Sequence, residues 1–205
     1  MSVIHLFMMK KTDIYPSKSL TKDVIQQIGT RLNNGELCVV PTETVYGLAG
    51  NGLDATAIQK IYAAKGRPSD NPLILHVASP AMVETIAASI SKEAHALMRT
   101  FWPGPLTIVF KKQSHVPDAV TGGLDTVAVR MPAHPLTLKI IEAAQVPLAA
   151  PSANLSGRPS STRFSHVYDD LNGRVDMIID DADSSIGIES TVVDCSNETV
   201  TILRP

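Results

Sequence analysis

The sequence has few cysteines, few aromatic residues, little net charge and no long hydrophobic run. Two cysteines, Cys38 and Cys195, cannot build a disulfide framework or a zinc site with four ligands. A formal net charge of -2 argues against a general nucleic-acid binder. No apolar stretch approaches the roughly 18 residues of a membrane span, and the first basic pair follows the apolar start, opposite to a signal peptide. A soluble cytoplasmic enzyme or small-ligand module is expected.

Common metal and nucleotide motifs are also missing. No two of the six histidines lie three or four residues apart, and HExxH does not occur, so no residue is predicted to ligate a transition metal. There is no P-loop, and Gly47, Gly50 and Gly52 have the wrong order for a dinucleotide fingerprint. A Rossmann fold is therefore a weak interpretation.

Hydrophobic periodicity predicts alternating helices and strands. Asp54, Ser79 and Ser91 are expected to cap helices, with Pro80 at the first helical position. Helices are expected at 21–33, 54–64, from 79, 91–101, near 135–145 and 163–171. Strands are expected at 36–40, 73–77, 106–110, 127–131, 146–149, 177–179, 190–194 and 200–203. The pattern predicts a single α/β domain with a mixed parallel and antiparallel twisted sheet, whose last two strands form an antiparallel hairpin.

Polar strings follow or precede these strands. They are PTETVYGL (41–48), KGRPSDNPL (65–73), TVAVRMP (126–132), PSANLSG (151–157) and GIESTVVD (187–194). Four cations, Lys65, Arg67, Arg130 and Arg204, lie within these strings or in the terminal LRP. Each one alone is more simply a solvated surface charge, but their convergence at strand ends would suit a nucleotide together with a small carboxylate.

These strings and FWPGPLT, in this order, closely resemble the YrdC-like family of threonylcarbamoyl-AMP synthases over residues 21–205. The resemblance implies a mixed twisted sheet around a large concave basic cavity. It also implies a nucleotidyltransferase that converts L-threonine, bicarbonate or CO2, and ATP into threonylcarbamoyl-AMP and pyrophosphate for the N6-threonylcarbamoyladenosine modification of tRNA. Residues 1–20 would form an N-terminal extension and residues 21–205 the catalytic domain.

The resemblance also implies residue roles. The positions expected around threonine are Thr44, His76, Arg130, the backbone at Ala150, and Ser190. The positions expected around ATP are Arg67, Asn71, Thr126, Ser152, Ser160 and Arg204. A polar quartet of active members, expected to be catalytic, is matched by Lys65, Arg67, Ser152 and Asn154. Lys65 and Arg67 would neutralise charge at the phosphates, so replacing either by alanine is expected to leave folding intact and to remove most of the activity. Without the resemblance His76 would be a core histidine, and Tyr46 would fill the core as readily as it would touch a substrate.

Expected partners are the three small substrates and the proteins that transfer the threonylcarbamoyl group, and Mg²⁺ is expected to accompany ATP. Glu43 and Glu189 would bind Mg²⁺ through water or make turn hydrogen bonds. Two alternatives stay open: a module that binds tRNA or double-stranded RNA, and an inactive paralogue like YciO. The aromatic content of 4% speaks against the first, and the KGRP and SAN strings against the second.

Overall fold

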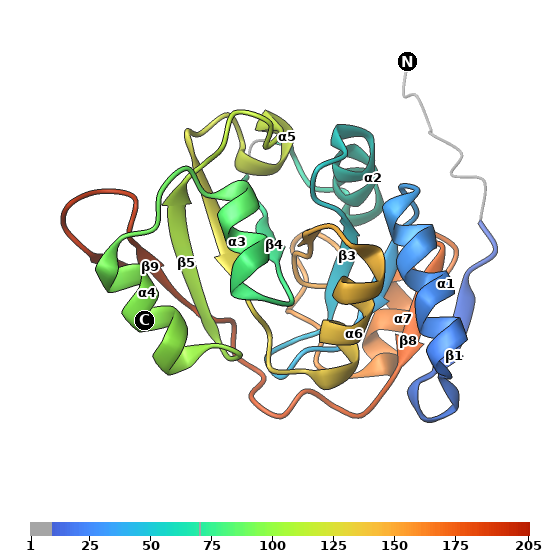
Figure 1. The fold of residues 1–205 in the computed structure, drawn as a ribbon. Coiled ribbons are helices and arrows are strands. Elements are labelled where there is room, and N and C mark those ends of the chain that lie inside the picture. The colour runs from blue at the N-terminus through green and yellow to red at the C-terminus, as the bar shows by residue number, and fades with distance from the viewer. Residues whose placement is uncertain (1–9, 70) are drawn as a thin grey trace, which may run out of the picture.

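Strands and helices alternate along most of the chain in the computed structural model, which describes residues 10–69 and 71–205 (Figure 1). The strands are β1 (Asp13–Pro16), β2 (Cys38–Val40), β3 (Gly47–Asn51), β4 (Ile74–His76), β5 (Leu106–Lys111), β6 (Thr126–Arg130), β7 (Leu148–Ala149), β8 (Met177–Asp180), β9 (Thr191–Asp194) and β10 (Thr201–Arg204). The α-helices are α1 (Lys22–Asn33), α2 (Ala55–Lys65), α3 (Pro80–Ile86), α4 (Lys92–Phe101), α5 (Asp118–Thr121), α6 (Pro135–Ala144) and α7 (Phe164–Leu171). A short 3-10 helix (Ser17–Ser19) follows β1.

Three helices begin at the capping residues that the sequence predicts. The Asp54 side chain accepts a hydrogen bond from the Thr56 amide at the start of α2. Ser79 caps α3, which has Pro80 in its first turn, and Ser91 caps α4. Each cap satisfies an amide that the helix itself leaves unpaired, so these helix starts are encoded locally.

One mixed sheet joins all ten strands in the order β1-β8-β2-β3-β7-β4-β6-β5-β9-β10. The sheet contains parallel pairs, such as β4 with β6 and β5 with β9, and antiparallel pairs, such as β5 with β6. The mixed α/β prediction is therefore confirmed. The last two strands, β9 and β10, are antiparallel neighbours, as expected of a hairpin.

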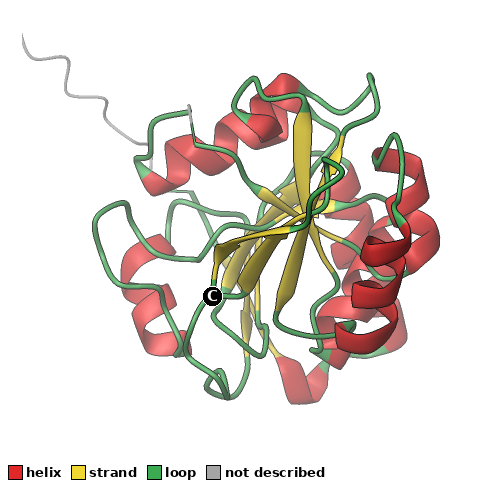
Figure 2. Cartoon of the chain, turned by 90° about the vertical axis from the view of Figure 1, so that its left-hand side faces the viewer, coloured by secondary structure: helices red, strands yellow, loops and turns green. Residues whose placement is uncertain are grey.

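Helices cover both sides of the sheet, as Figure 2 shows with the sheet seen in depth. On one side α1 and α6 pack together, and their Ile28 and Ile140 share a buried cluster with Val40 of β2. The other cluster joins α2 and several other helices to side chains that include Leu48 of β3 and Ile108 of β5. Strands with apolar residues on both faces are typical of a sheet buried between two helical layers.

Three elements were not predicted from the sequence. The first is β1, which pairs in parallel with β8, so part of the segment interpreted as an N-terminal extension lies in the sheet. Residues 1–9 of that segment lie outside the described residues. The others are α5, a single turn, and β3, which lies between β2 and β7 and is buried along its whole length. In the described ranges no helix is both long and apolar enough to cross a membrane.

Candidate active site

A cavity opens where several strands and their following loops meet. Its volume is about 220 Å³, and it is lined by residues from β4 and from all five polar strings and by Arg204. Of the residues predicted for substrate binding, eight line it: Thr44, Arg67, His76, Arg130, Ala150, Ser152, Ser190 and Arg204. Three guanidinium groups therefore face one space, with Glu189 as the carboxylate among the lining side chains. Such a cavity favours an anionic ligand.

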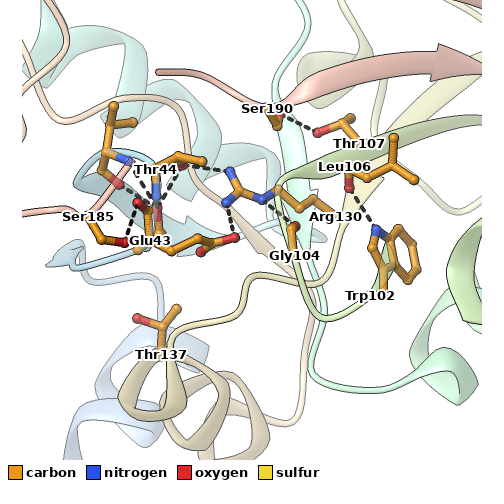
Figure 3. Close-up of polar contacts among 12 residues, drawn as sticks. Glu43, Thr44, Trp102, Gly104, Leu106, Thr107, Arg130, Thr137, Ser185 and Ser190 are labelled. Carbon is orange, nitrogen blue, oxygen red and sulfur yellow. Dashed lines mark hydrogen bonds and ion pairs between the residues drawn. The ribbon is translucent and has the colours of Figure 1, made fainter. Parts of the chain in front are cut away.

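Arg130 is the buried cation of this cavity, at the end of β6 with only 4% of its surface exposed. Its Nη2 donates to Glu43 Oε1 at 2.6 Å, its Nη1 to Thr44 Oγ1 at 2.8 Å, and its Nε to the Gly104 carbonyl at 3.2 Å (Figure 3). A guanidinium has five N–H groups, so two remain for a ligand. Arg130 is therefore held on three sides and keeps capacity for a carboxylate.

The hydroxyl of Thr44 is oriented by its neighbour Thr42. Thr42 Oγ1 donates to the Val45 carbonyl at 2.6 Å and lies 2.9 Å from Thr44 Oγ1. Because the Thr42 proton is used on a carbonyl, Thr42 does not donate to Thr44, and its oxygen accepts from the Thr44 and Val45 amides at 3.2 Å. Arg130 occupies one acceptor position of Thr44. The acceptor position that is left can meet only a ligand N–H or O–H group.

His76 lies beside Arg130 at the end of β4, the strand that pairs with β6. Burial and, to a smaller extent, the positive charge of Arg130 together lower the pKa of His76 to about 3. The imidazole is therefore neutral at physiological pH. A neutral ring does not add to the positive charge of the cavity, and its Nδ1 lies 3.4 Å from the Ile74 carbonyl, which leaves Nε2 for a ligand.

This lowered pKa predicts a pH dependence of stability. Between about pH 3 and the ordinary value of 6.5, the unfolded chain binds a proton on His76 that the folded chain does not. Stability is therefore lost as the pH falls below 6.5, by up to about 1.4 kcal/mol per pH unit. Urea unfolding between pH 4.5 and 7.5 should show that His76→Gln removes this component. An exposed control, His95→Gln, should follow the wild-type curve, and a His76→Gln curve parallel to the wild type would contradict the neutral assignment.

Lys65 ends α2 and turns inward. Its Nζ donates to the carbonyls of Ser152 and of Asn154, the latter at 2.7 Å, and the residue is 3% exposed. Burial lowers the pKa of the ammonium group to about 8, with a smaller contribution from Arg67. Gly66 follows at φ 61°, a left-handed conformation that favours glycine and lets Arg67 turn into the cavity. Within the predicted quartet, Lys65 therefore holds the PSAN loop (residues 151–154). The Arg67 side chain faces the cavity and has no hydrogen bond or ion pair among the described residues.

The PSAN loop is held from several directions. Asn154 is buried, and its Nδ2 donates to the carbonyls of Leu155 at 2.9 Å and Arg158 at 2.7 Å. Asp170 of α7 accepts from the Leu155 amide at 3.0 Å and pairs with Arg158. Asn154 does not line the cavity, whereas Ser152 does. In this structure, the Asn154 side chain therefore shapes the loop that presents Ser152.

The C-terminal strand supplies a third wall of the cavity. Arg204 Nε donates to the Ser190 carbonyl at 2.8 Å, and its Nη1 pairs with Glu189. Ser160, another predicted ATP position, donates to Glu189 Oε1 at 3.1 Å. Arg204 is thus tied to the segment before β9 although it is the next-to-last residue of the sequence.

Three predicted ATP positions, Asn71, Thr126 and Ser160, do not line this cavity. Thr126 begins β6 and Arg130 ends it, which separates them by about 13 Å along an extended strand. Asn71 is exposed, and its carbonyl accepts a hydrogen bond from Tyr62 at 2.6 Å. Tyr46 is buried, and its hydroxyl donates to the Asp181 carbonyl at 2.8 Å, so it belongs to the core. The ATP roles of all six positions stay predictions.

Sequence reasoning missed three residues that organise this site. Glu43 was considered only for Mg²⁺ or a turn, yet it forms the ion pair with Arg130, with its other oxygen buried and without a partner among the described residues. Thr42 and Thr107 were not singled out, although each contacts the hydroxyl of a cavity residue. Thr42 adjoins Thr44 in PTETVYGL, so its string was a usable signal. Thr107 is the last residue of FWPGPLT, but nothing in that string indicates its contact with Ser190, 83 residues away.

The described residues do not fit a metal ion held by the protein. They contain no group of three or more His, Cys, Asp or Glu side chains that could hold one. Glu43 and Glu189, the two carboxylates considered for Mg²⁺, are paired with Arg130 and Arg204. We therefore derive no step of the reaction through a metal.

Comparison with known proteins places the chain in a family. The profile of the Sua5/YciO/YrdC family, described as "Telomere recombination", matches residues 30–205. The threonylcarbamoyl-AMP synthase of Pyrococcus abyssi is 53% identical over 85% of this chain and 51% of its own length, and that of Bacillus subtilis is 46% identical over 94% and 56%. The chain spans about half the length of these curated relatives.

Solved structures agree with this placement. Pyrococcus abyssi Sua5, crystallised with L-threonine, aligns with a TM-score of 0.90 and 47% identity over 96% of this chain and 57% of that one. Escherichia coli YciO aligns with a TM-score of 0.79 over 96% and 95%, but at 23% identity it supports the fold alone. Because the family profile matches most of its length, the chain belongs to the Sua5/YciO/YrdC family.

Proposed function

We propose that this chain makes threonylcarbamoyl-AMP and pyrophosphate from L-threonine, CO2 or bicarbonate, and ATP, for modification of tRNA. The observation on which the proposal chiefly depends is Arg130, a buried guanidinium that keeps two N–H groups beside the acceptor hydroxyl of Thr44. A carboxylate and an ammonium on one carbon suit these two neighbours. The 47% identity to a Sua5 crystallised with L-threonine supports the same ligand.

The proposed chemistry needs no covalent intermediate on the protein. The threonine amine adds to CO2 and loses a proton, which gives a carbamate. A carbamate oxygen then attacks the α-phosphorus of ATP, and pyrophosphate leaves with the electron pair of the broken P–O bond. Because an anion approaches a polyanion, catalysis depends on positioning and on neutralisation of charge.

Particular side chains would perform these tasks. Arg130 would hold the threonine carboxylate, with His76 and Ser190 on the same wall of the cavity. Arg67 and Arg204, which also line the cavity, would meet the phosphates. Lys65 would act indirectly, by holding the carbonyls of Ser152 and Asn154 in the loop that presents Ser152 to the cavity. Mg²⁺ would arrive as part of the ATP substrate and be held by its phosphates.

Release of pyrophosphate from ATP tests the proposal. We expect release that requires both L-threonine and bicarbonate, and that stops when either is omitted. Release that occurs with ATP alone would contradict the proposed reaction. A contaminating enzyme that cleaves ATP to pyrophosphate would release it equally in preparations of the wild type and of the Arg130→Met variant described below, so that comparison identifies it.

The same assay separates the remaining alternatives. An inactive paralogue like YciO would bind ligands and release no pyrophosphate under any of these conditions. An RNA-binding module would retain RNA in a filter assay with a steep dependence on salt and would show no turnover. The three guanidinium groups of the cavity and the near-zero net charge of the chain favour a small anionic substrate over a long polyanion.

A further inference from the structure

Ser190 is in contact with a second buried hydroxyl that does not line the cavity. Thr107 Oγ1 lies 2.7 Å from Ser190 Oγ, and the two residues are 0% and 2% exposed (Figure 3). Thr107 belongs to β5, where its register partners are Arg130 of β6 and Val192 of β9. Ser190 immediately precedes β9 and lines the cavity. The pair therefore links the interior of the sheet to the ligand space.

The direction of this hydrogen bond follows from the partners that each hydroxyl has. Among the described residues, Thr107 Oγ1 has no hydrogen-bond partner other than Ser190. If Ser190 donated, the Thr107 proton would be buried without an acceptor, which proteins rarely tolerate. Thr107 therefore donates to Ser190.

This direction leaves the Ser190 proton available to a ligand. The Ser190 oxygen accepts from Thr107 and also from Arg204 Nη2 at 3.4 Å. A serine hydroxyl has two acceptor positions and one proton, so both acceptor positions are used. The cavity then offers a ligand two different hydroxyls: Thr44 keeps one acceptor position, because Thr42 does not donate to it and Arg130 uses only the other, and Ser190 donates.

We propose that Thr107 is a positioning residue that makes Ser190 a hydrogen-bond donor toward an acceptor oxygen of the bound amino acid. The inference rests on the proposed function, since it takes L-threonine as the ligand of this cavity. It adds a residue outside the cavity to those that set affinity and specificity. An amino acid that offers a donor to Thr44 and an acceptor oxygen to Ser190 is matched at both positions.

Two substitutions of Thr107 separate this role from packing. Thr107→Val keeps the volume of the side chain and removes the hydroxyl, whereas Thr107→Ser keeps the hydroxyl and removes a buried methyl group. Packing alone would make the serine variant the more damaged one. We expect the reverse for binding: about a fivefold rise in the Kd for L-threonine in Thr107→Val, and less than a twofold change in Thr107→Ser, even if its Tm is lower.

Calorimetric titration of L-threonine measures these Kd values without ATP, and steady-state assays add KM values. In Thr107→Val the KM for L-threonine should rise about fivefold while the KM for ATP stays within twofold. Thr12→Val is the matched control, because Thr12 Oγ1 donates to the Val175 carbonyl at 2.7 Å near β1, at the opposite edge of the sheet. It should lower the Tm and leave the Kd for L-threonine unchanged.

The possible failures give different patterns. If the wild type binds L-threonine and Thr107→Val binds it equally well, the role of Thr107 is overturned while the proposed function stands. If Thr107→Ser weakens binding as much as Thr107→Val, affinity follows the shape of the side chain, and the positioning role is also overturned. If the wild type does not bind L-threonine, the proposed function fails and the inference fails with it.

Discussion

Replacement of Arg130 by methionine is expected to lower kcat/KM for L-threonine by about 100-fold or more. A hydrogen bond between charged groups is worth about 1.5–3 kcal/mol, and Arg130 has two N–H groups left for the carboxylate. The substitution also leaves Glu43 as a buried charge without its partner, which commonly costs about 3–5 kcal/mol of stability. Pyrophosphate release and urea unfolding measure the two effects.

A second substitution separates binding from folding in this experiment. In the double variant Glu43→Gln with Arg130→Met no charge is left unpaired, so most of the stability should return while the activity stays low. Arg31→Met is the matched control, because Arg31 on α1 pairs with Glu36 and Asp13 away from the cavity. It should lose stability and keep the KM for L-threonine. A double variant with the wild-type KM would show that Arg130 does not hold the carboxylate.

Replacement of Lys65 by methionine is expected to reduce pyrophosphate release by about 100-fold, because the loop that presents Ser152 loses its restraint and a misplacement of about 1 Å can cost that much in rate. It should also lower the Tm, because the carbonyls of Ser152 and Asn154 lose their shared donor. From the sequence, substitution of Lys65 or Arg67 was expected to leave folding intact. The structure keeps that expectation for Arg67, whose side chain has no hydrogen bond or ion pair within residues 10–69 and 71–205.

The comparison of three variants tests this distinction. Arg67→Met should lose activity with an unchanged Tm, and Lys65→Met should lose both. Lys60→Met, on the same helix, removes a similar bond from an ammonium group to the Gly35 carbonyl at 2.7 Å, and should keep full activity. Full turnover in Lys65→Met would remove Lys65 from the catalytic machinery. Full turnover in Arg67→Met would do the same for Arg67.

Local signals explain which elements were predictable. The caps at Asp54, Ser79 and Ser91 act within one helical turn, so their effect can be read from a few neighbouring residues. Strand β3 has the sequence GLAGN, in which two glycines weaken any propensity for a strand. It is a strand because β2 and β7 pair with it on either side. Glycine is needed at position 50 because a Cβ there would lie 2.9 Å from Leu37 Cδ2. That close packing is a property of the assembled sheet.

The candidate site divides in the same way. Its cations and hydroxyls were predicted because they stand in short polar strings at strand ends or in the terminal LRP, and six of these residues line one cavity. Their roles within it were less visible. Lys65 was expected to face the phosphates and instead holds two backbone carbonyls, while Glu43 proved to be the partner of Arg130.

The order of polar and apolar residues is enough to specify the α/β class, the helix starts and the set of charged groups available for an anionic ligand, because these depend on periodicity, caps and composition. The neighbouring sequence does not determine which partner each hydroxyl donates its hydrogen bond to. Thr107 and Ser190 are 83 residues apart in the chain and meet only because β5 and β9 are neighbours in the sheet. Burial then gives the Thr107 proton a single destination. The donor at Ser190 and the ion pair that restrains Arg130 are therefore products of the tertiary structure. It brings distant segments together and buries their polar groups, so that these groups must pair with one another.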